Sequence, residues 1–504
     1  MQRSLLATCA LCLALGACTV GPDYVRPEVA APAAYANDPA PRPAAADAEL
    51  AQWWQQFDDP VLDQLVEQAL ASNIDVQIAS SRIAEARYRL AAAKASALPE
   101  VDATASANHT DLSENSGLSS LASALGGGQS GSGGGSSGGG SATASPGLPG
   151  QGFSTFSAGF DASWEPDIFG GARRASEAAR ANLAASEWSQ RDTQVRLTAE
   201  VARTLFTLRE LQAQQVLAQQ LADVRSAEVD ALRAKVAQDL VPDAELAQPL
   251  AQLSQAQAQV AQLQGSERAQ RAALAVLLGT TVQNLPADLD GPQASAAPAA
   301  IAIPAGLPSE LLQRRPDIRA AERNLAAATA QIGVARADRF PHISLTGVVD
   351  LISSALSSLV SSDSLQTVVQ GQAAFPLLDF GRGAAKEGVA REQAQQAALS
   401  YRQSVLGAFA DVEQSLATLA AQRANNQSLQ DQLEQAQVAE AAAQTRFDTG
   451  LTDFLPLGQA REGVLAARQA LAESDLSLRQ AEIATFKALG GGWSETAQQS
   501  ADTQ

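Results

Sequence analysis

The chain contains one long helical pattern twice. Residues 380–490 align with residues 169–279 at an offset of 211 without a gap. Apolar residues recur in both copies at spacings of 3, 4 and 7, which predicts helices that pack against each other along a seam. Each copy has a turn, near residues 239–242 and 450–453, after which the pattern returns. A helix of about 65 residues is roughly 100 Å long, too long for a globular core and suited to the wall of a tube.

A second alignment shows that each half of the chain begins in the same way. Residues 72–99 align with residues 314–341 at an offset of 242, and both segments end at a proline. The first half therefore carries 31 additional residues before its long helix. They fall in the loop at 110–152, which contains a Gly/Ser-rich stretch at 126–141 with the composition of a flexible linker. The repeat favours one body built from two similar halves over several independent domains.

Four short segments alternate between apolar and small polar residues, as strands do. They lie at about 100–109, 153–165, 342–350 and 366–376. This period fits strands of an outer-membrane barrel, with lipid on one side and water on the other. A water-soluble sheet with one buried face is the alternative. Four strands cannot close a barrel, and open edges do not persist in hydrocarbon, so a barrel would require several copies of the chain.

The first residues have the features of a bacterial secretion signal. Residues 1–17 carry one arginine and then an apolar run that is too short for a stable transmembrane helix. The segment before Cys18 resembles a lipobox, at which the signal is removed and the new terminal cysteine is acylated. Thr19 in the next position resembles lipoproteins that are sent to the outer membrane. The alternative is an ordinary signal with an incidental cysteine.

Composition argues against an enzyme and against nucleic-acid binding. The net charge is −19, whereas phosphate binding requires basic patches. All three cysteines lie within the first eighteen residues, so the body offers no thiol for catalysis or metal binding. The two histidines, His109 and His342, have no partners at ligand spacing, and the Gly-rich stretch lacks the lysine of a phosphate loop. We expect no catalytic residue, no metal and no cofactor.

Three segments resemble a known family. The sequence reads CTVGPDYVRP at 18–27, WWQQFDDPVLDQLVEQAL at 53–70 and LLQRRPDIRAAERNLAAATAQIGVARADRFP at 311–341. These segments are similar to the TolC-like outer-membrane efflux channels, in particular to the lipidated OprM- and NodT-type outer membrane factors of tripartite RND efflux systems. The resemblance implies a homotrimer with a twelve-stranded barrel in the outer membrane and helices in the periplasm. It also implies a periplasmic adaptor protein and an inner-membrane RND-type transporter as partners.

The expected fold is therefore α+β, with an antiparallel helical barrel, four transmembrane strands per chain and a two-fold internal repeat. The first repeat would open with one helix from about Asp59 to Ala97. The expected divisions are a signal peptide (1–17), a lipidated extended segment (18–58), the first repeat (59–279), a linker (280–308), the second repeat (309–490) and a flexible tail (491–504).

The candidate gate lies at the helix turns. Asp243, Asp448, Asp453 and Phe454 would surround the periplasmic end of the pore, where a ring of acids attracts cations. In the family, an aspartate on the return helix narrows the entrance. This chain has Pro456 and Gln459 where an acid would be expected. The alternative is that these acids are merely solvated.

The leading functional prediction is a passive exit duct that exports drugs or other small toxic compounds. One alternative is the outer-membrane component of a type I protein secretion system. A second alternative is a lipid-anchored coiled-coil stalk with a Gly/Ser-rich tip. The alternating strands on both sides of that tip argue against a stalk, which would need no lipid-facing barrel.

Overall fold

The computed structural model describes residues 19–37, 50–111, 152–289, 301, 303, 306 and 308–493. The predicted signal 1–17, Cys18, the Gly/Ser stretch 126–141, and parts of the linker 280–308 and of the tail 491–504 lie outside the described residues. The chain divides into two compact units, and both contain segments from each half of the repeat. Unit 1 comprises Met1–Asp23, Leu90–Ala178 and Thr329–Arg391, and unit 2 comprises Tyr24–Arg89, Ala179–Ala328 and Glu392–Gln504.

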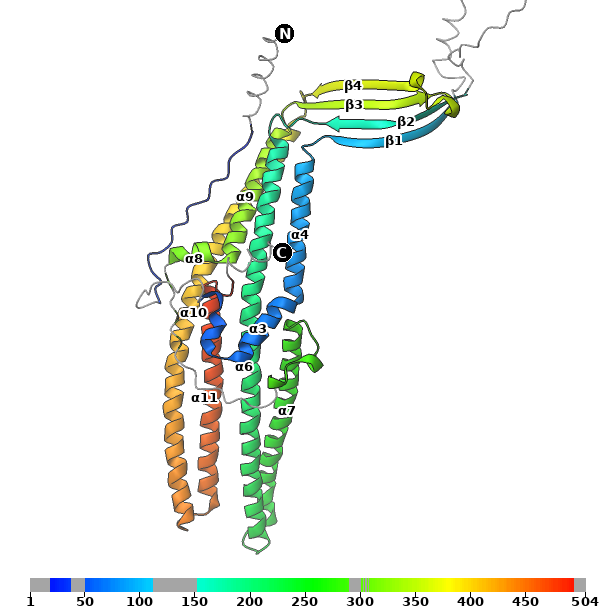
Figure 1. Cartoon of the computed structure of the whole chain (residues 1–504). Coiled ribbons are helices and arrows are strands. Elements are labelled where there is room, and N and C mark those ends of the chain that lie inside the picture. Colours follow the sequence, from blue (N-terminus) through cyan, green and yellow to red (C-terminus); the bar gives the residue numbers. More distant parts are fainter. Residues whose placement is uncertain are drawn as a thin grey trace, which may run out of the picture. The chain divides into compact units, whose positions relative to one another are not determined.

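Most of the described residues are helical (Figure 1). The two longest helices have 66 and 67 residues, so each is about 100 Å long at ~1.5 Å per residue. A 3-10 helix, η2 (Trp53–Phe57), precedes them in the chain. The α-helices are α3 (Pro60–Ser72), α4 (Ile74–Ala95), α6 (Gly171–Val236), α7 (Ala247–Leu277), α8 (Pro308–Arg314), α9 (Pro316–Ala337), α10 (Arg382–Asp448) and α11 (Phe454–Ala488).

The single helix expected over residues 59–97 is wrong in one respect, because the structure has two helices there. Asn73 between α3 and α4 has extended backbone geometry. Its side-chain oxygen accepts hydrogen bonds from the backbone N–H of Asp75 and Val76, at 2.8 and 3.2 Å, and so caps the start of α4. Its amide nitrogen donates to the Leu277 carbonyl at 2.9 Å. Asparagine competes with helical hydrogen bonding in this way, and the apolar periodicity does not reveal it.

The internal repeat recurs in the backbone at the ends of the long helices. Asp239 and Gly450, which the offset of 211 makes equivalent, both have left-handed geometry, with φ of 56° and 71°. After α6 the N–H of Leu240 donates to Lys235, and after α10 the N–H of Leu451 donates to Arg446, each at the equivalent position. Helices commonly end with such a left-handed residue because its bonds satisfy the last carbonyls. The repeat is thus visible in hydrogen bonds as well as in sequence.

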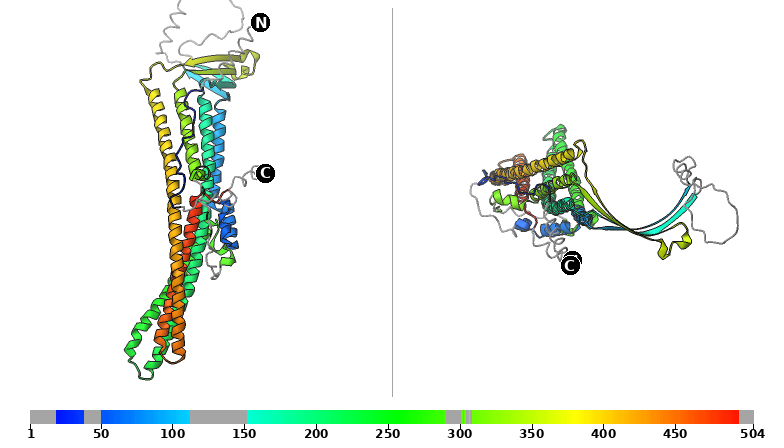
Figure 2. Two further views of the ribbon diagram at one scale, coloured as in Figure 1. Left: turned by 90° about the vertical axis from the view of Figure 1, so that its left-hand side faces the viewer. Right: turned by 90° about the horizontal axis from the view of Figure 1, so that it is seen from above.

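Unit 1 contains a four-stranded antiparallel sheet in the order β1-β2-β3-β4. Seen from above, the sheet is bent along its strands (Figure 2). Every residue of β4 and of β1 is exposed in the isolated chain, whereas β3 is mostly half-buried. The predicted combination of long helices with four strands is confirmed. The strands are β1 (Glu100–Asp111), β2 (Gly152–Trp164), β3 (His342–Ser353) and β4 (Leu365–Ala374).

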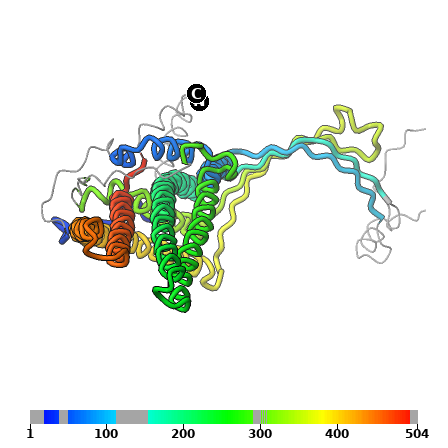
Figure 3. Tube along the Cα trace, turned by 90° about the horizontal axis from the view of Figure 1, so that it is seen from below, coloured from blue at the N-terminus to red at the C-terminus, as the bar shows by residue number. Residues whose placement is uncertain are grey.

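Unit 2 has its core where short aromatic segments pack against the long helices. Trp53 is fully buried and stacks on Phe486, with ring centroids 5.3 Å apart. The extended N-terminal segment also contributes, since Tyr35 is buried in a cluster with Ile318 and Tyr401. Seen from below, α6 lies beside α7 and α10 beside α11, which gives two helical hairpins (Figure 3). Within the described part of the chain, no helix is both long enough and apolar enough to span a bilayer.

Candidate functional site at the helix turns

The turns of the two hairpins carry the acids singled out in the sequence. Asp243 is exposed in a short 3-10 helix, η3 (Asp243–Leu246), between α6 and α7. Asp448, the last residue of α10, accepts a hydrogen bond from the Gln444 amide at 2.8 Å. Asp453 occupies the position just before α11, and Phe454 begins that helix with its ring edge-on to Phe447, 6.1 Å between centroids. Pro456 fits because the first turn of a helix needs no backbone N–H there.

One ion pair at the turns joins the two hairpins. The ammonium of Lys235, near the end of α6, lies 3.3 Å from the Asp453 carboxylate in the other hairpin. Both side chains are about half exposed, at 47% and 59%. Exposed pairs of this kind typically contribute ~0–1 kcal/mol. The structure therefore brings one predicted acid into a link between hairpins, but by itself the link is weak.

A second, better-shielded ion pair joins the same hairpins further from the turns. The guanidinium of Arg225 on α6 holds both oxygens of Glu462 on α11, at 2.9 and 3.0 Å. Only 21% and 24% of the two side chains are exposed. Arg225 also donates to Glu228 and to the amide oxygen of Gln252, each at 3.0 Å. A two-pronged guanidinium–carboxylate contact is stronger and more directional than a lysine pair.

Burial and charge act in opposite directions on Glu462. Burial raises the pKa of its carboxyl, Arg225 lowers it, and the negative charge of Glu228 raises it again. The net direction is upward. Acidification therefore protonates this carboxyl earlier than an exposed glutamate, and protonation removes the charge that Arg225 holds.

Sequence reasoning missed Arg225 and Glu462. Their equivalents in the other copy of the repeat are Ala436 and Ala251, so both charges stand where the repeat has a neutral residue. This asymmetry is a weak signal, because other charges of α6, such as Glu228 and Asp230, also face an alanine in the second copy. The partner of each charge could not be identified in this way, since 237 positions separate the two residues.

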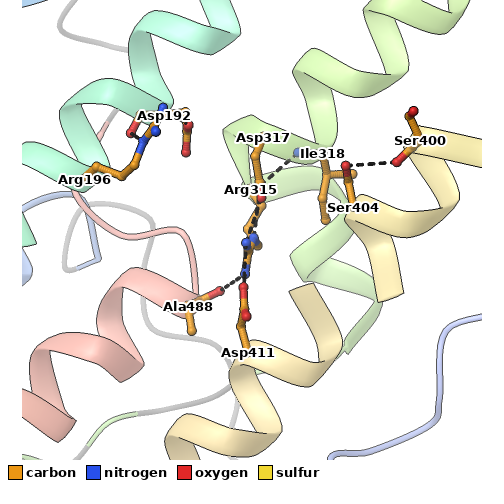
Figure 4. A network of polar contacts seen from close by, with 9 residues as sticks. All are labelled: Asp192, Arg196, Arg315, Asp317, Ile318, Ser400, Ser404, Asp411 and Ala488. Carbon is orange, nitrogen blue, oxygen red and sulfur yellow. Dashed lines mark hydrogen bonds and ion pairs between the residues drawn. The ribbon is translucent and has the colours of Figure 1, made fainter. Parts of the chain in front are cut away.

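A second polar cluster in unit 2 forms around Arg315, in the Arg-Arg-Pro-Asp segment at 314–317. Arg315 pairs with Asp317 at 2.7 Å and with Asp411 at 3.0 Å, and it donates to the Ala488 carbonyl at 3.2 Å (Figure 4). Pro316 begins α9, a position where its missing backbone N–H costs no helical hydrogen bond. The cluster ties the start of α9 to α10 and to the end of α11, which is a structural role.

The two histidines make ordinary polar contacts. His109 lies 2.9 Å from the Ser154 hydroxyl, and His342 lies 2.7 Å from a carboxylate oxygen of Glu165. Among the described residues, no group of three or more His, Cys, Asp or Glu side chains is arranged to hold a metal ion.

Comparison with known proteins identifies the family. The family model for outer membrane efflux proteins matches residues 65–280 and 307–491. The probable efflux pump outer membrane protein TtgC of Pseudomonas putida is 30% identical over 98% of this chain and 97% of its own length. The pyoverdine export outer membrane protein OpmQ of Pseudomonas aeruginosa is 31% identical over 98% of both chains. The solved outer-membrane channel OprN superposes with a TM-score of 0.79 at 31% identity, covering 94% of this chain and all of OprN. The chain belongs to the outer membrane efflux protein family.

Proposed function

We propose that this outer-membrane efflux channel works as a trimer, in which three copies of the sheet close one barrel. The observation that carries the proposal is the pair of unpaired sheet edges at β1 and β4. In hydrocarbon every backbone polar group needs a partner, so the edges must pair with other copies. Four strands are also too few to close a barrel, and the interior of an eight-stranded barrel is filled by side chains, so an open pore needs more strands than two copies supply. The long helices extend the duct into the periplasm.

The cargo we propose is small and varied. Relatives with 30–31% identity to this chain include a toluene efflux protein, a pyoverdine export protein and the cation efflux protein CusC. Since similar walls serve such different compounds, the duct itself needs no selective pocket. Selection would then belong to the proposed partners, an inner-membrane RND-type transporter and a periplasmic adaptor. The adaptor would dock on the two hairpin turns.

The same turns would form the gate. The ion pairs Arg225–Glu462 and Lys235–Asp453 would hold the two hairpins together in the resting channel. Asp453, with Asp448 or Asp243, would add negative charge at the entrance and attract cations. Phe454 would contribute an apolar wall beside them.

Single-channel recording in a planar bilayer tests the proposed function. The full-length, detergent-extracted protein is expected to give discrete current steps with a preference for cations, because the entrance is acidic. A heat-denatured sample of the same preparation is the control for detergent artefacts. A protein that inserts into the bilayer but carries no current would contradict the duct.

The lipid anchor is proposed at Cys18, which lies outside the described residues. We expect the substitution Cys18→Ser to abolish labelling with a radioactive fatty acid, because the acylated sulfur is removed. Part of the protein should still reach the outer membrane, since the strands carry their own membrane affinity. Cys12→Ser, in the predicted signal, is the matched control and should leave the labelling unchanged. Persistent labelling of the Cys18→Ser protein would contradict the lipobox.

A further inference from the structure

The two outer strands of the sheet lack a partner on one side. Among the described residues, β1 pairs only with β2, and β4 pairs only with β3 (Figure 1). If copies of the chain close a barrel, as proposed above, β4 of one copy must pair with β1 of the next. That proposal does not say which residues face each other. The internal repeat supplies this information.

The repeat relates strands as well as helices. The offset of 242 carries β1 onto β3, and the offset of 211 carries β2 onto β4. The structure allows a direct check, because β1–β2 and β3–β4 are equivalent hairpins. Glu100 faces Ser163 in the first hairpin, and the two offsets turn this pair into His342 and Ala374. Those two residues face each other in the second hairpin. The equivalence therefore holds to the single residue.

Applying the two offsets to the β2–β3 pair predicts which residues face each other between neighbouring copies. In the chain, Ala162 faces Gly347 and Asp161 faces Val348. Since β2 corresponds to β4 and β3 to β1, we infer that β4 pairs antiparallel with β1 of the neighbouring copy in one defined register. In this register Ala373 faces Ala105 of the neighbouring copy, and Gln372 faces its Ser106.

The side-chain pattern supports this register independently. In β1 the apolar residues have odd numbers, and in β4 Leu365, Val369 and Ala373 are odd, whereas Val368 and Ala374 are even. The inferred register pairs odd with odd, so most apolar side chains of the two strands share one face. A slip by one residue would place the apolar residues of one strand on the polar face of the other. Gln372 beside Ser106 likewise brings two polar side chains together.

A contact next to the strands extends the same surface. Phe169, just after β2, stacks on Phe340, just before β3, with ring centroids 4.8 Å apart. The offsets convert this pair into Phe380 and Leu98. Both are exposed in the isolated chain, at 92% and 65%. Phe380 of one copy would therefore cover Leu98 of the next and shield two apolar side chains from water.

Cysteine cross-linking of the full-length protein tests the register, since the body carries no native cysteine. Two matched variants are Ala373→Cys with Ala105→Cys and Gln372→Cys with Ser106→Cys. Directly opposed pairs alternate between two backbone geometries, and together the variants sample both. After mild oxidation of the outer-membrane protein, covalent oligomers are expected on non-reducing gels. Joining Leu98→Cys to Phe380→Cys with a short bis-maleimide should give oligomers as well.

Offset pairs provide the matched controls. Ala373→Cys combined with Ala107→Cys or with Ala103→Cys keeps the same face but shifts the pair by two residues. Diagonal Cβ atoms are then ~7–8 Å apart, beyond the reach of a disulfide, so the yield should fall by about ten-fold or more. Ala105→Cys with Ala158→Cys, which face each other within the chain, controls for oxidation. That disulfide should form without any oligomer.

The outcomes test the inferred register separately from the proposal that several copies close a barrel. Oligomers from the matched pairs alone support the inference. Oligomers mainly from an offset pair would overturn the register and leave a barrel closed by several copies in place. If no pair gave oligomers while the Ala105–Ala158 control oxidised, closure by neighbouring copies would itself be wrong.

Discussion

The double substitution Arg225→Ala with Asp453→Ala is expected to raise the single-channel conductance several-fold. It removes the two ion pairs described above, one at the turn and one further up α6. Without them the hairpins stay joined by the apolar core around Phe206 and Phe486, which lies further from the turns, so the periplasmic end can widen. The recordings described above measure this directly, with parent and variant at the same salt concentration.

The two single substitutions should change the conductance by different amounts. Arg225 makes a bidentate, mostly buried contact with Glu462 and also contacts Glu228 and Gln252. Arg225→Ala should therefore account for most of the increase in conductance. Asp453→Ala removes a half-exposed pair and should change the conductance much less, although it should lower the preference for cations. Adding Asp448→Ala removes a second charge beside it and should lower that preference further.

Two controls separate the link between hairpins from a general loss of charge. Asp230 pairs with Arg233 on the same helix, 3.2 Å apart, and crosses to no other hairpin, so Asp230→Ala should leave the conductance unchanged. Exchanging the charges, with Lys235→Asp and Asp453→Lys together, keeps an ion pair between the hairpins. With Arg225 unchanged, this variant should carry the same current as the parent. If the double variant matched the parent in current, ion preference and response to divalent cations, the constriction would lie elsewhere, for instance at the apolar Phe454 and Leu455.

Much of the architecture can be predicted from the sequence because the sequence contains an internal repeat. The apolar spacing predicts the long helices, and the two offsets predict which turns and which strands are equivalent. Asp239 and Gly450 then share one backbone conformation even though only one of them is glycine. Such agreement between distant segments constrains a fold more than the propensity of any single segment does.

The contacts between surfaces that are distant in sequence could not be predicted in the same way. The Arg225–Glu462 pair depends on which faces of α6 and α11 meet, and helical periodicity does not determine that. Asn73 illustrates a second limit, because a single side chain ends one helix and caps the next without disturbing the apolar pattern. For the N-terminal segment the sequence predicts an extended course, but it does not reveal that Tyr35 from that segment is buried.

Buried acidic residues within the long helices are a further feature that the apolar periodicity does not predict. Glu482 on α11 is only 1% exposed, and its surroundings include Arg479, Arg423 and the backbone of Ile301. Burial raises the pKa of its carboxyl to about 7, against the pull of the two arginines. Glu210 on α6 is shifted in the same direction, to about 6, also chiefly by burial.

These two shifts lower the stability of the folded protein as the pH rises from about 4.5 to about 7. A carboxyl with a raised pKa holds its proton more tightly in the folded state than in the unfolded chain. Its contribution to the free energy of unfolding is therefore fully present below about 4.5 and is lost as the pH rises through about 7. At roughly 1.4 kcal/mol per pKa unit, the loss from Glu482 alone is about 3 kcal/mol.

Glu482→Gln should remove most of this pH dependence. Glutamine has the shape and neutrality of the protonated acid, so the variant should match the parent near pH 4 and be more stable by up to about 3 kcal/mol near pH 8. Denaturant unfolding of the detergent-extracted protein at a series of pH values measures the difference. The slope that remains should reflect the other carboxyls with a raised pKa, Glu210 and Glu462 among them. Glu434→Gln, at an exposed position of α10, is the control and should leave the curve of the parent unchanged. If the curves of Glu482→Gln and the parent ran parallel from pH 5 to pH 8, Glu482 would be charged throughout that range, held in that state by Arg479 and Arg423 despite its burial.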